Sequence, residues 1–439
     1  MKFLKEANFN NFDKNIFFLF NIILLILPLL FFNPFAYTNY FFIIILYVIC
    51  ILIPVFFLNK SLKKNHSLVD ISFWVYVYIF LGFAGIIQLN TNQIPWVNTF
   101  PINDIFKVIG MIFLGIMGFI YGRYQGFSFQ IPRRFISVRR TDFLFLTSIS
   151  LVILLFYLIG FEKIIFPRLL FDLAIKEASY LEMLLIRFLK VSLFVCLISY
   201  LIQIRNNQIS YPRLIFISFF MFIYFNPIRS ERLSFLMLVS FLALYFFNFN
   251  KKFWMSSLLL GLAFIFPYLD YFRESLTANS FSKKTSYDVT QHFITGDFDA
   301  LSTIYFSIKY VSFNGYLFFS NFFNSLIVYI PRSIWPDKPI SSSFSLTDDS
   351  NIQFSSIATN YWAEGYLALG GIGIFISLYF LGLSINSFLI KKNQSHFSEI
   401  IYIFFIPYMI YFLRGDLYSI SFRLLPLIAF AFFVTKKKN

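Results

Sequence analysis

Long apolar runs separated by short charged loops constrain this chain more than any other feature. IFFLFNIILLILPLLFF at 16–32 and YFFIIILYVICILIPVFFL at 40–58 each match a helix of about 20 residues, the length that crosses a hydrocarbon core about 30 Å thick. Of the 439 residues, 59% are hydrophobic and 13% charged, which leaves too little polar surface to cover a soluble globule. The sequence therefore predicts an all-α, polytopic integral membrane protein.

Apolar length predicts about twelve transmembrane helices, and no small-residue cleavage site follows the first, so we expect the N-terminus to be retained. The expected spans are 16–32, 37–58, 69–90, 104–122, 142–160, 181–204, 213–226, 233–249, 253–270, 366–390, 398–413 and 417–434.

Basic residues predict the orientation. Over half of the 36 Lys and Arg fall in alternate loops and at the two ends of the chain. Basic loops face the cytoplasm, so both termini are expected there. This placement also argues against nucleic acid as a partner, because the cations orient spans instead of forming a phosphate-binding face.

The predicted topology divides the chain into helices 1–9 at 1–270, a large outer loop at 271–365, and helices 10–12 with a basic tail at 366–439. A loop of this length is where function is expected. Within it, YLFFSNFFNSLIVYI at 316–330 is too short for a crossing and is expected to be a re-entrant or interfacial helix. The mixed segment 164–180 is expected to lie on the membrane surface.

Several cations fall on the outer side, against the topological rule. Charge at a bilayer edge is costly, so its retention suggests function. Each arginine has a structural alternative, which is to reach a headgroup or pair with a nearby carboxylate, as Arg414 could with Asp416. As a set they favour an anionic pyrophosphate, which the guanidinium fork suits. These cations are Arg229, Arg232, Arg273, Arg332, Lys338 and Arg414, with Arg423 inside the last span.

Few acids and bases are available on the outer side. Glu364 in NYWAEGY and His292 in QHFITGDFD are the candidate general bases, because an apolar pocket can shift either pKa toward neutrality. Asp297 and Asp299 are candidate sugar contacts, and helix capping before ALSTIYF is the alternative for both. For Glu364 the alternative is an interfacial salt bridge.

No cofactor or metal is expected. The other two histidines, His66 and His396, fall in cytoplasmic loops, and Cys50 and Cys196 lie inside apolar runs, so no metal-binding cluster can be drawn. Walker and dinucleotide-binding motifs are also lacking, which leaves ATP-driven transport and nucleotide-dependent redox chemistry without support.

The order of motifs resembles the O-antigen polymerase (Wzy-type) family of oligosaccharide repeat-unit polymerases. The resemblance rests on NPIRSERLSF, GDFDALSTI, IPRSIWPDKP, NYWAEGYLALGGIGI and YFLRGD, and spans roughly residues 220 to 420. It implies a GT-C-like membrane glycosyltransferase that joins undecaprenyl-pyrophosphate-linked repeat units into O-antigen or capsular polysaccharide at the periplasmic face of a bacterial inner membrane. It also implies a flippase and a chain-length regulator as possible partners.

This resemblance assigns roles to particular residues. Arg229, Arg232, Arg332 and Arg414 would hold pyrophosphate, with Arg273 and Lys338 as weaker additions. A lipid pyrophosphate is an activated leaving group, so cations and one base, Glu364 before His292, would suffice without a metal. PRSIWPDKP would then be a rigid clamp in which prolines fix the backbone, Trp335 meets the interface or a sugar, and Arg332 and Lys338 face phosphate. An interface-anchored structural turn is the alternative.

Two other functions remain open. An O-antigen ligase would use the same donor and a catalytic histidine in the large loop, for which only His292 qualifies. A lipid-linked oligosaccharide flippase would line a central cavity with charges from many spans and have two similar halves, neither of which is evident here. A pore or structural subunit would not need the outer arginines.

Overall fold

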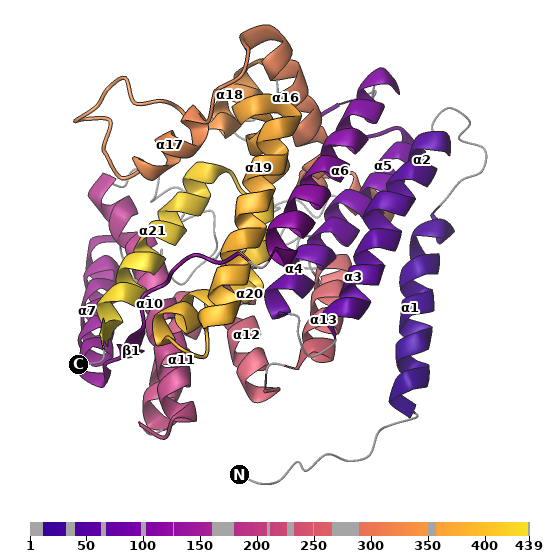
Figure 1. Cartoon of the computed structure of the whole chain (residues 1–439). Helices are drawn as coiled ribbons and strands as arrows, with labels where there is room; N and C mark the ends of the chain where they lie inside the picture. The colour runs from indigo at the N-terminus through magenta and orange to yellow at the C-terminus, as the bar shows by residue number, and fades with distance from the viewer. Residues whose placement is uncertain are drawn as a thin grey trace, which may run out of the picture.

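A computed structural model shows a bundle of helices (Figure 1). The structure describes residues 12–31, 40–62, 67–97, 102–125, 127–159, 180–208, 211–225, 232–248, 250–265, 289–349 and 357–437. The predicted surface segment 164–180 lies outside this part of the chain except for its last residue, and so do Arg229 and Arg273.

Helices occur at all twelve positions where apolar runs predict them. The first nine are α1 (Phe12–Leu30), α2–η1–α3 (Tyr40–Tyr47, Val48–Leu52, Ile53–Ser61), α4–η2–α5 (Leu68–Tyr76, Val77–Phe83, Ala84–Thr91), α6 (Ile102–Tyr124), α7 (Val138–Ile159), α10 (Tyr180–Arg205), α11 (Tyr211–Tyr224), α12 (Arg232–Phe246) and α13–η3 (Lys251–Leu260, Gly261–Ile265). The last three are α19 (Tyr361–Lys391), α20 (His396–Arg414) and α21 (Leu417–Val434).

The chain is a polytopic membrane protein by the length and apolarity of these helices. Within the described residues, seven helices are long and apolar enough to cross a membrane. Large apolar side chains such as Phe41, Phe56 and Phe219 are exposed on helix surfaces, as contact with lipid requires.

The segment predicted as an outer loop is largely helical where it is described. It contains α15 (Val289–Phe293), the 3₁₀ turn η4 (Gly296–Phe298), α16 (Ala300–Asn314), α17 (Ser320–Leu326) and α18 (Ser342–Asp349). The helix expected over 316–330 is shorter than predicted, because φ is positive at Gly315, Phe318 and Phe319 and the helix begins only at Ser320. Its 7 residues span about 10 Å and do not cross the membrane.

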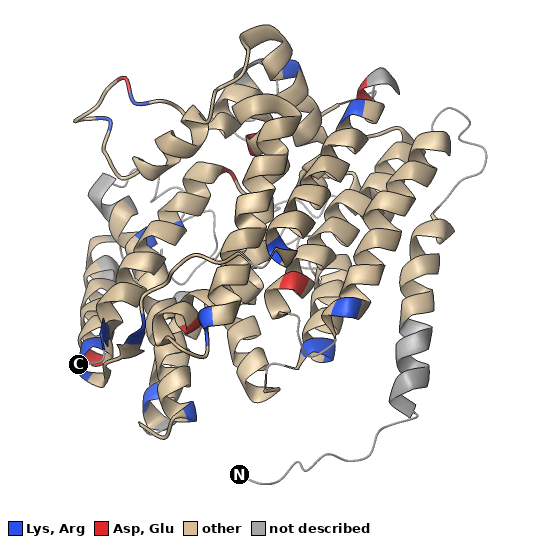
Figure 2. Cartoon of the chain, in the orientation of Figure 1, with Lys and Arg blue, Asp and Glu red and all other residues tan. Residues whose placement is uncertain are grey.

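A two-stranded antiparallel sheet of β1 (Arg134–Ile136) and β2 (Thr435–Lys437) closes the opposite end of the bundle from α17 and α18 (Figure 1). Arg134 is buried there, with Nη2 donating to the Thr435 carbonyl at 2.7 Å and to the Phe432 carbonyl at 3.0 Å. Figure 2 shows Lys and Arg gathered toward this end, with fewer at the other.

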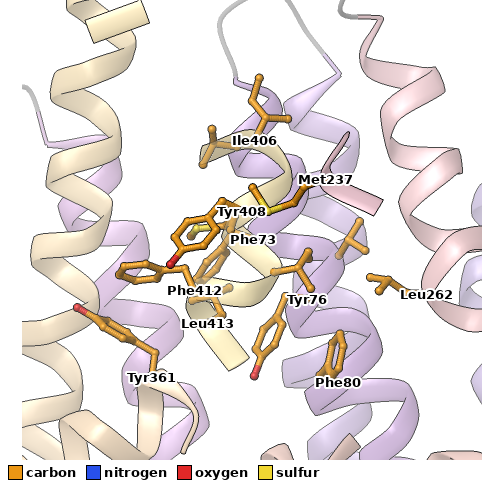
Figure 3. Close-up of a cluster of buried hydrophobic side chains, with 14 of the residues drawn as sticks. Phe73, Tyr76, Phe80, Met237, Leu262, Tyr361, Ile406, Tyr408, Phe412 and Leu413 are labelled. Atoms are coloured by element: carbon orange, nitrogen blue, oxygen red, sulfur yellow. The ribbon is translucent and has the colours of Figure 1, made fainter. Parts of the chain in front are cut away.

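Aromatic side chains fill the centre of the bundle (Figure 3). Phe73 and Tyr76 of α4 and Phe80 of η2 lie in the same cluster as Tyr408 and Phe412 of α20. Tyr361 at the start of α19 joins them, with its ring centroid 4.9 Å from that of Phe412. The start of α19 therefore lies inside the bundle.

Glycines allow α6 and α19 to approach backbone to backbone. A Cβ on Gly118 would lie 2.5 Å from the Phe375 carbonyl oxygen, and one on Gly122 would lie 2.0 Å from that of Tyr379. The G-x-x-x-G spacing of Gly118 and Gly122 is typical of tightly packed membrane helices. The close packing of α6 against the later part of α19 supports the first residues of α19, which lie in the bundle centre.

Replacing Gly122 by alanine is expected to lower the thermal unfolding temperature of the detergent-solubilised protein, because the added methyl group would force the backbones apart, at a cost of about 1–3 kcal/mol. Gly110 on the same helix is the matched control, since a Cβ there meets nothing within 4 Å. Gly110→Ala should leave Tm unchanged or raise it, as alanine favours helix. Equal Tm shifts in the two variants would contradict the packing described.

A buried ion pair joins α4 to α6 near the basic end. Arg123 Nε donates to Asp70 Oδ1 at 2.8 Å and Nη2 to Oδ2 at 2.9 Å, while Nη1 donates to Asn386 Oδ1 of α19 at 2.9 Å. Asp70 is also half of a capping box with Ser67 at the start of α4. Arg123 therefore ties three helices together.

Arg123→Met is expected to cost about 3–5 kcal/mol of unfolding free energy, because it leaves the Asp70 carboxylate buried without a cation. The double variant Asp70→Asn, Arg123→Met should recover most of that loss, since the amide keeps the cap and carries no charge. Lys107→Met, which breaks the exposed pair with Asp104, should change stability by less than about 1 kcal/mol. Chemical denaturation in detergent measures all three, and a double variant as unstable as Arg123→Met contradicts the assignment.

Candidate functional site

The chain reverses direction inside α19, and this reversal positions Glu364. Leu369 (φ −161°, ψ 36°) and Gly370 (φ 63°, ψ −145°) are not helical. In a straight helix Tyr361 and Ser377 would lie about 24 Å apart along the axis, yet the Tyr361 hydroxyl is 3.5 Å from the Ser377 carbonyl. The residues before Leu369 therefore form a short arm that packs back against the long arm from Gly371 to Lys391.

Two glycines make the reversal possible. Gly370 adopts a positive φ that side chains disfavour, and a Cβ there would lie 3.0 Å from the Tyr316 hydroxyl. Where the arms meet, a Cβ on Gly373 would lie 2.2 Å from the Gly365 carbonyl oxygen. The tenth predicted span, 366–390, therefore starts a few residues too early. Its first residues belong to the short arm, and the long arm starts only after Gly370.

The short arm is anchored at its start. Asn360 caps it by accepting from the Ala363 amide at 2.8 Å, and its own amide nitrogen donates to the Ala300 carbonyl at 2.6 Å. Trp362 donates from its indole nitrogen to the Ile112 carbonyl of α6 at 3.3 Å. These bonds place Glu364 one turn above the cap, facing α17 and α18.

Glu364 is fully buried and accepts hydrogen bonds from three segments. Oε1 accepts from the Leu417 amide at 3.1 Å and from the Ser342 hydroxyl, and Oε2 accepts from Asn321 Nδ2 at 2.7 Å. A buried carboxylate is costly without such donors. Glu364 is therefore the point at which α17, α18 and the start of α21 converge. The interfacial salt bridge that was the structural alternative for Glu364 is not found among the described residues.

A cavity of about 530 Å³ opens next to this carboxylate. Asn321 and Ser342, two of the three donors to Glu364, line it, together with Leu417, whose amide is the third. Its other described lining residues are Leu317, Ser320, Asn324, Pro339, Ile340, Ser345 and Tyr418. Glu364 thus lies one hydrogen bond behind the cavity wall.

Arg414 binds the GDFD motif. Its Nη2 donates to the Gly296 carbonyl at 3.1 Å and to Asp297 Oδ1 at 3.2 Å. Pairing with the neighbouring Asp416 was the structural alternative for Arg414, and the structure shows a pairing with a carboxylate across the fold, Asp297. The turn from Arg414 to Leu417 then connects the motif to Glu364, because the next helix begins with the amide that Glu364 accepts.

Asp299 occupies the N-cap position of α16 without making the capping bond that was the structural alternative. It is 3% exposed, and burial raises the pKa of its carboxyl to about 7, although Arg414 pulls that pKa down. Asp297 adds to the rise by repulsion. Burial also raises the pKa of Asp416 in the nearby turn. Asp299 is therefore a buried acid that titrates near neutral pH.

His292 lies in α15 and is buried, with its ring 5.4 Å from the Phe298 ring. The structure holds it beside the GDFD turn through aromatic packing, and the Gln88 amide donates to the Phe293 and Phe298 carbonyls, both at 2.8 Å. Glu364, by contrast, is bonded to Asn321, Ser342 and the Leu417 amide. The two predicted bases therefore belong to different clusters.

The PRSIWPDKP stretch forms a turn in which Arg332 and Lys338 behave differently. Lys338 is buried, and its ammonium donates to the Val328 carbonyl at 2.7 Å and to the Ile330 carbonyl at 2.9 Å. It therefore holds the turn together, as the alternative of a structural turn expects, and its ammonium is bonded to backbone carbonyls. Arg332 is exposed, with long bonds of 3.3 and 3.5 Å to the Pro336 and Pro339 carbonyls, and Trp335 is 39% exposed beside it.

The remaining predicted cations lie elsewhere. Arg232 is the first residue of α12, and its side chain is outside the described part, as are Arg229 and Arg273. Arg423 stacks on Tyr411, with its guanidinium carbon 3.8 Å from the ring centroid. In the described residues no group of three or more His, Cys, Asp or Glu is arranged to hold a metal ion.

Asn321, Ser342 and Tyr418 were not predicted from the sequence. Each is an uncharged polar residue in an ordinary context, and nothing local marks it as a partner of Glu364 or of the cavity.

Comparisons of the chain with protein-family models, curated proteins and solved structures find no match.

Asp299→Asn is expected to remove a pH dependence of stability. A carboxyl with a folded pKa of about 7 against about 3.9 in the unfolded chain stabilises the fold fully below pH 4, and loses that stability as pH rises toward and past 7. Each pKa unit corresponds to about 1.4 kcal/mol. Wild-type Tm should therefore fall more between pH 5 and pH 8 than that of Asp299→Asn.

Asp337→Asn, in the exposed turn, is the control and should keep the wild-type pH profile. Parallel Tm profiles for wild type and Asp299→Asn would show that Asp299 titrates outside this range.

Proposed function

We propose that this protein is a metal-independent membrane glycosyltransferase that polymerises undecaprenyl-pyrophosphate-linked oligosaccharide repeat units into O-antigen or capsular polysaccharide. The observation that carries the proposal is Glu364, a buried carboxylate held by three donors directly behind a polar cavity. A buried acid beside a cavity is a common arrangement for a general base.

The distribution of charge supports a periplasmic site in a bacterial inner membrane. Lys and Arg gather at the end of the bundle that carries β1 and β2, and α17 and α18 lie at the other end (Figures 1 and 2). The positive-inside rule would then make the β1–β2 end cytoplasmic and the cavity end periplasmic. Twelve crossings and a GT-C-like arrangement are part of this proposal.

The arrangement around Glu364 supports a proton relay. Ser342 lines the cavity and donates its hydroxyl proton to Glu364. An acceptor hydroxyl in the cavity would pass its proton to Ser342 Oγ as the Ser342 proton moves to Glu364. The acceptor oxygen then bonds to the anomeric carbon of the donor, the bond from that carbon to pyrophosphate breaks, and undecaprenyl pyrophosphate leaves with the electron pair.

The leaving pyrophosphate needs cations. Arg332 is the described candidate that is exposed at this end, and Arg229, Arg232 and Arg273 remain predicted contributors. Arg414 is held by Asp297, so in this proposal it orders the turn next to Glu364. A flippase that delivers repeat units and a chain-length regulator would be its partners in the same membrane.

Deleting the gene in its host and resolving surface glycans and undecaprenyl-linked intermediates on a gel tests the proposal. The deletion should leave surface lipid with a single repeat unit, and wild type should restore the ladder. Glu364→Gln and Ser342→Ala should lose it, because general-base catalysis contributes about 10²–10⁴-fold. Ser312→Ala, on the exposed face of α16, is the control and should restore it.

Protein levels in membranes and Tm of each variant separate loss of chemistry from loss of fold. A normal ladder with both Glu364→Gln and Ser342→Ala contradicts the relay. Full-length polymer held on undecaprenyl carrier would identify a ligase and direct attention to His292. Repeat units trapped on the cytoplasmic side would identify a flippase.

A further inference from the structure

The β1–β2 sheet brings basic side chains from distant parts of the chain to one edge of the bundle. Its register places Arg134 opposite Lys437 and Phe135 opposite Lys436. Side chains directly opposite each other in an antiparallel pair lie about 5 Å apart at Cβ, and like charges in this arrangement repel. Burial, and then repulsion from Arg140, lower the pKa of Arg134. The two strands therefore pair in spite of charge repulsion.

The exposed cations around this sheet are not neutralised by carboxylates. They are Arg133, Arg139, Arg140, Lys436 and Lys437. No ion pair of the described residues includes any of them. Other arginines near this end are paired, Arg205 with Glu399 and Arg213 with Asp142. The edge of the sheet is therefore a local excess of positive charge, which attracts an anion from outside the chain.

Arg140 fixes the cationic part of this surface against the end of α21. Its Nη1 donates to the Phe433 and Thr435 carbonyls, both at 3.2 Å, while Nε and Nη2 donate to no described residue. A guanidinium can present two such nitrogens together to the oxygens of a phosphate. Arg139 precedes Arg140 in the chain and Lys436 follows Thr435, so three cations meet within one residue of this contact.

Exposed apolar side chains begin directly beside these cations. On α7, Arg139, Phe143 and Leu146 follow one another at spacings of four and three residues, so they share one face of the helix, and all three are exposed. The ring of Phe433 on α21 also is exposed, with its centroid 6.1 Å from that of Phe143. Over about 10 Å along α7, the surface changes from charge to aromatic and then aliphatic carbon. A phospholipid has the same profile, with a phosphate above an acyl chain.

We propose that the β1–β2 edge binds an anionic phospholipid, with its phosphate held by Arg139, Arg140 and Lys436 and an acyl chain along Phe143 and Leu146. A soluble anion would meet the cations but gain nothing from the exposed apolar side chains. Phosphatidylethanolamine carries the same phosphate with an ammonium group, which the excess positive charge repels. Binding of an anionic lipid relieves the repulsion between the strands and so stabilises the sheet. This inference is independent of the proposed function.

Native mass spectrometry of the full chain in detergent tests the selectivity. The probes are phosphatidylglycerol and phosphatidylethanolamine with the same acyl chains, and phosphatidylglycerol should bind roughly tenfold more tightly. Phosphatidylglycerol should also raise Tm, and millimolar inorganic phosphate should not. Equal affinity for the two lipids, or an equal rise in Tm with phosphate alone, overturns the proposal.

Two double variants assign the binding to the sheet. Arg139→Gln with Lys436→Gln leaves the bonds of Arg140 in place and should weaken phosphatidylglycerol binding about 25-fold, because each cation near an anionic lipid is worth about fivefold in affinity. Lys107→Gln with Lys309→Gln removes two exposed cations of α6 and α16 and is the control of equal net charge. It should keep the wild-type affinity. Equal losses in the two double variants would show an effect of net charge alone and would overturn the proposal.

Stability without lipid separates binding from folding. The variant Arg139→Gln with Lys436→Gln should be at least as stable as wild type in detergent alone, because the charges that it removes repel their neighbours. A lower Tm would mean that these two cations stabilise the sheet by themselves, which contradicts an unneutralised cation site.

Phe143→Ala tests the contact with the acyl chain. It removes an exposed ring without touching a cation and should weaken binding of phosphatidylglycerol about fivefold. Phe313→Ala, at an exposed position of α16, is the control and should bind as wild type does. Full binding by Phe143→Ala would place the lipid away from α7 and overturn the proposal.

Discussion

The burial of the Glu364 carboxylate is the interaction on which this end of the molecule depends. A carboxylate that is removed from water must be given donors, and here they come from α17, from α18 and from the first amide of α21. Neither α17 nor α18 is long enough by itself to cross a membrane. Their shared acceptor brings them together, and the cavity is the space left between them.

The reversal at Leu369 and Gly370 explains how a carboxylate can reach this depth. A continuous helix would carry Glu364 out of the bundle, whereas the short arm returns it against the long arm. The turn from Arg414 to Leu417 then links this cluster to the one around Asp297 and Asp299. A change in the charge of Asp299 would therefore change the electrostatic environment of Arg414. Arg414 is three residues from Leu417, whose amide donates to Glu364.

The sequence predicts the helices well because each crossing of a bilayer requires about 20 consecutive apolar residues, and hydropathy shows directly where such runs occur. It does not predict the reversal, since LALGGIGI is as apolar as a continuous span and only the positive φ at Gly370 distinguishes it. Glu364 could be singled out as an isolated acid at an apolar edge, but Asn321 and Ser342 could not. For Lys338 the sequence predicts an anion from the charge alone, whereas the structure bonds the ammonium to backbone carbonyls, which carry no signature in sequence.

Two buried carboxylates in this protein, those of Asp70 and Glu364, differ in what happens to their partners when a proton is added. Asp70 is held by a bidentate bond from Arg123, so losing its charge would leave a buried guanidinium unpaired. Glu364 is bonded only to neutral donors, and no ion pair of the described residues includes it. Gaining a proton there leaves no opposite charge exposed to the apolar interior. A proton on Glu364 would therefore leave no buried cation unpaired, as the proposed relay requires, whereas Asp70 holds helices together through Arg123.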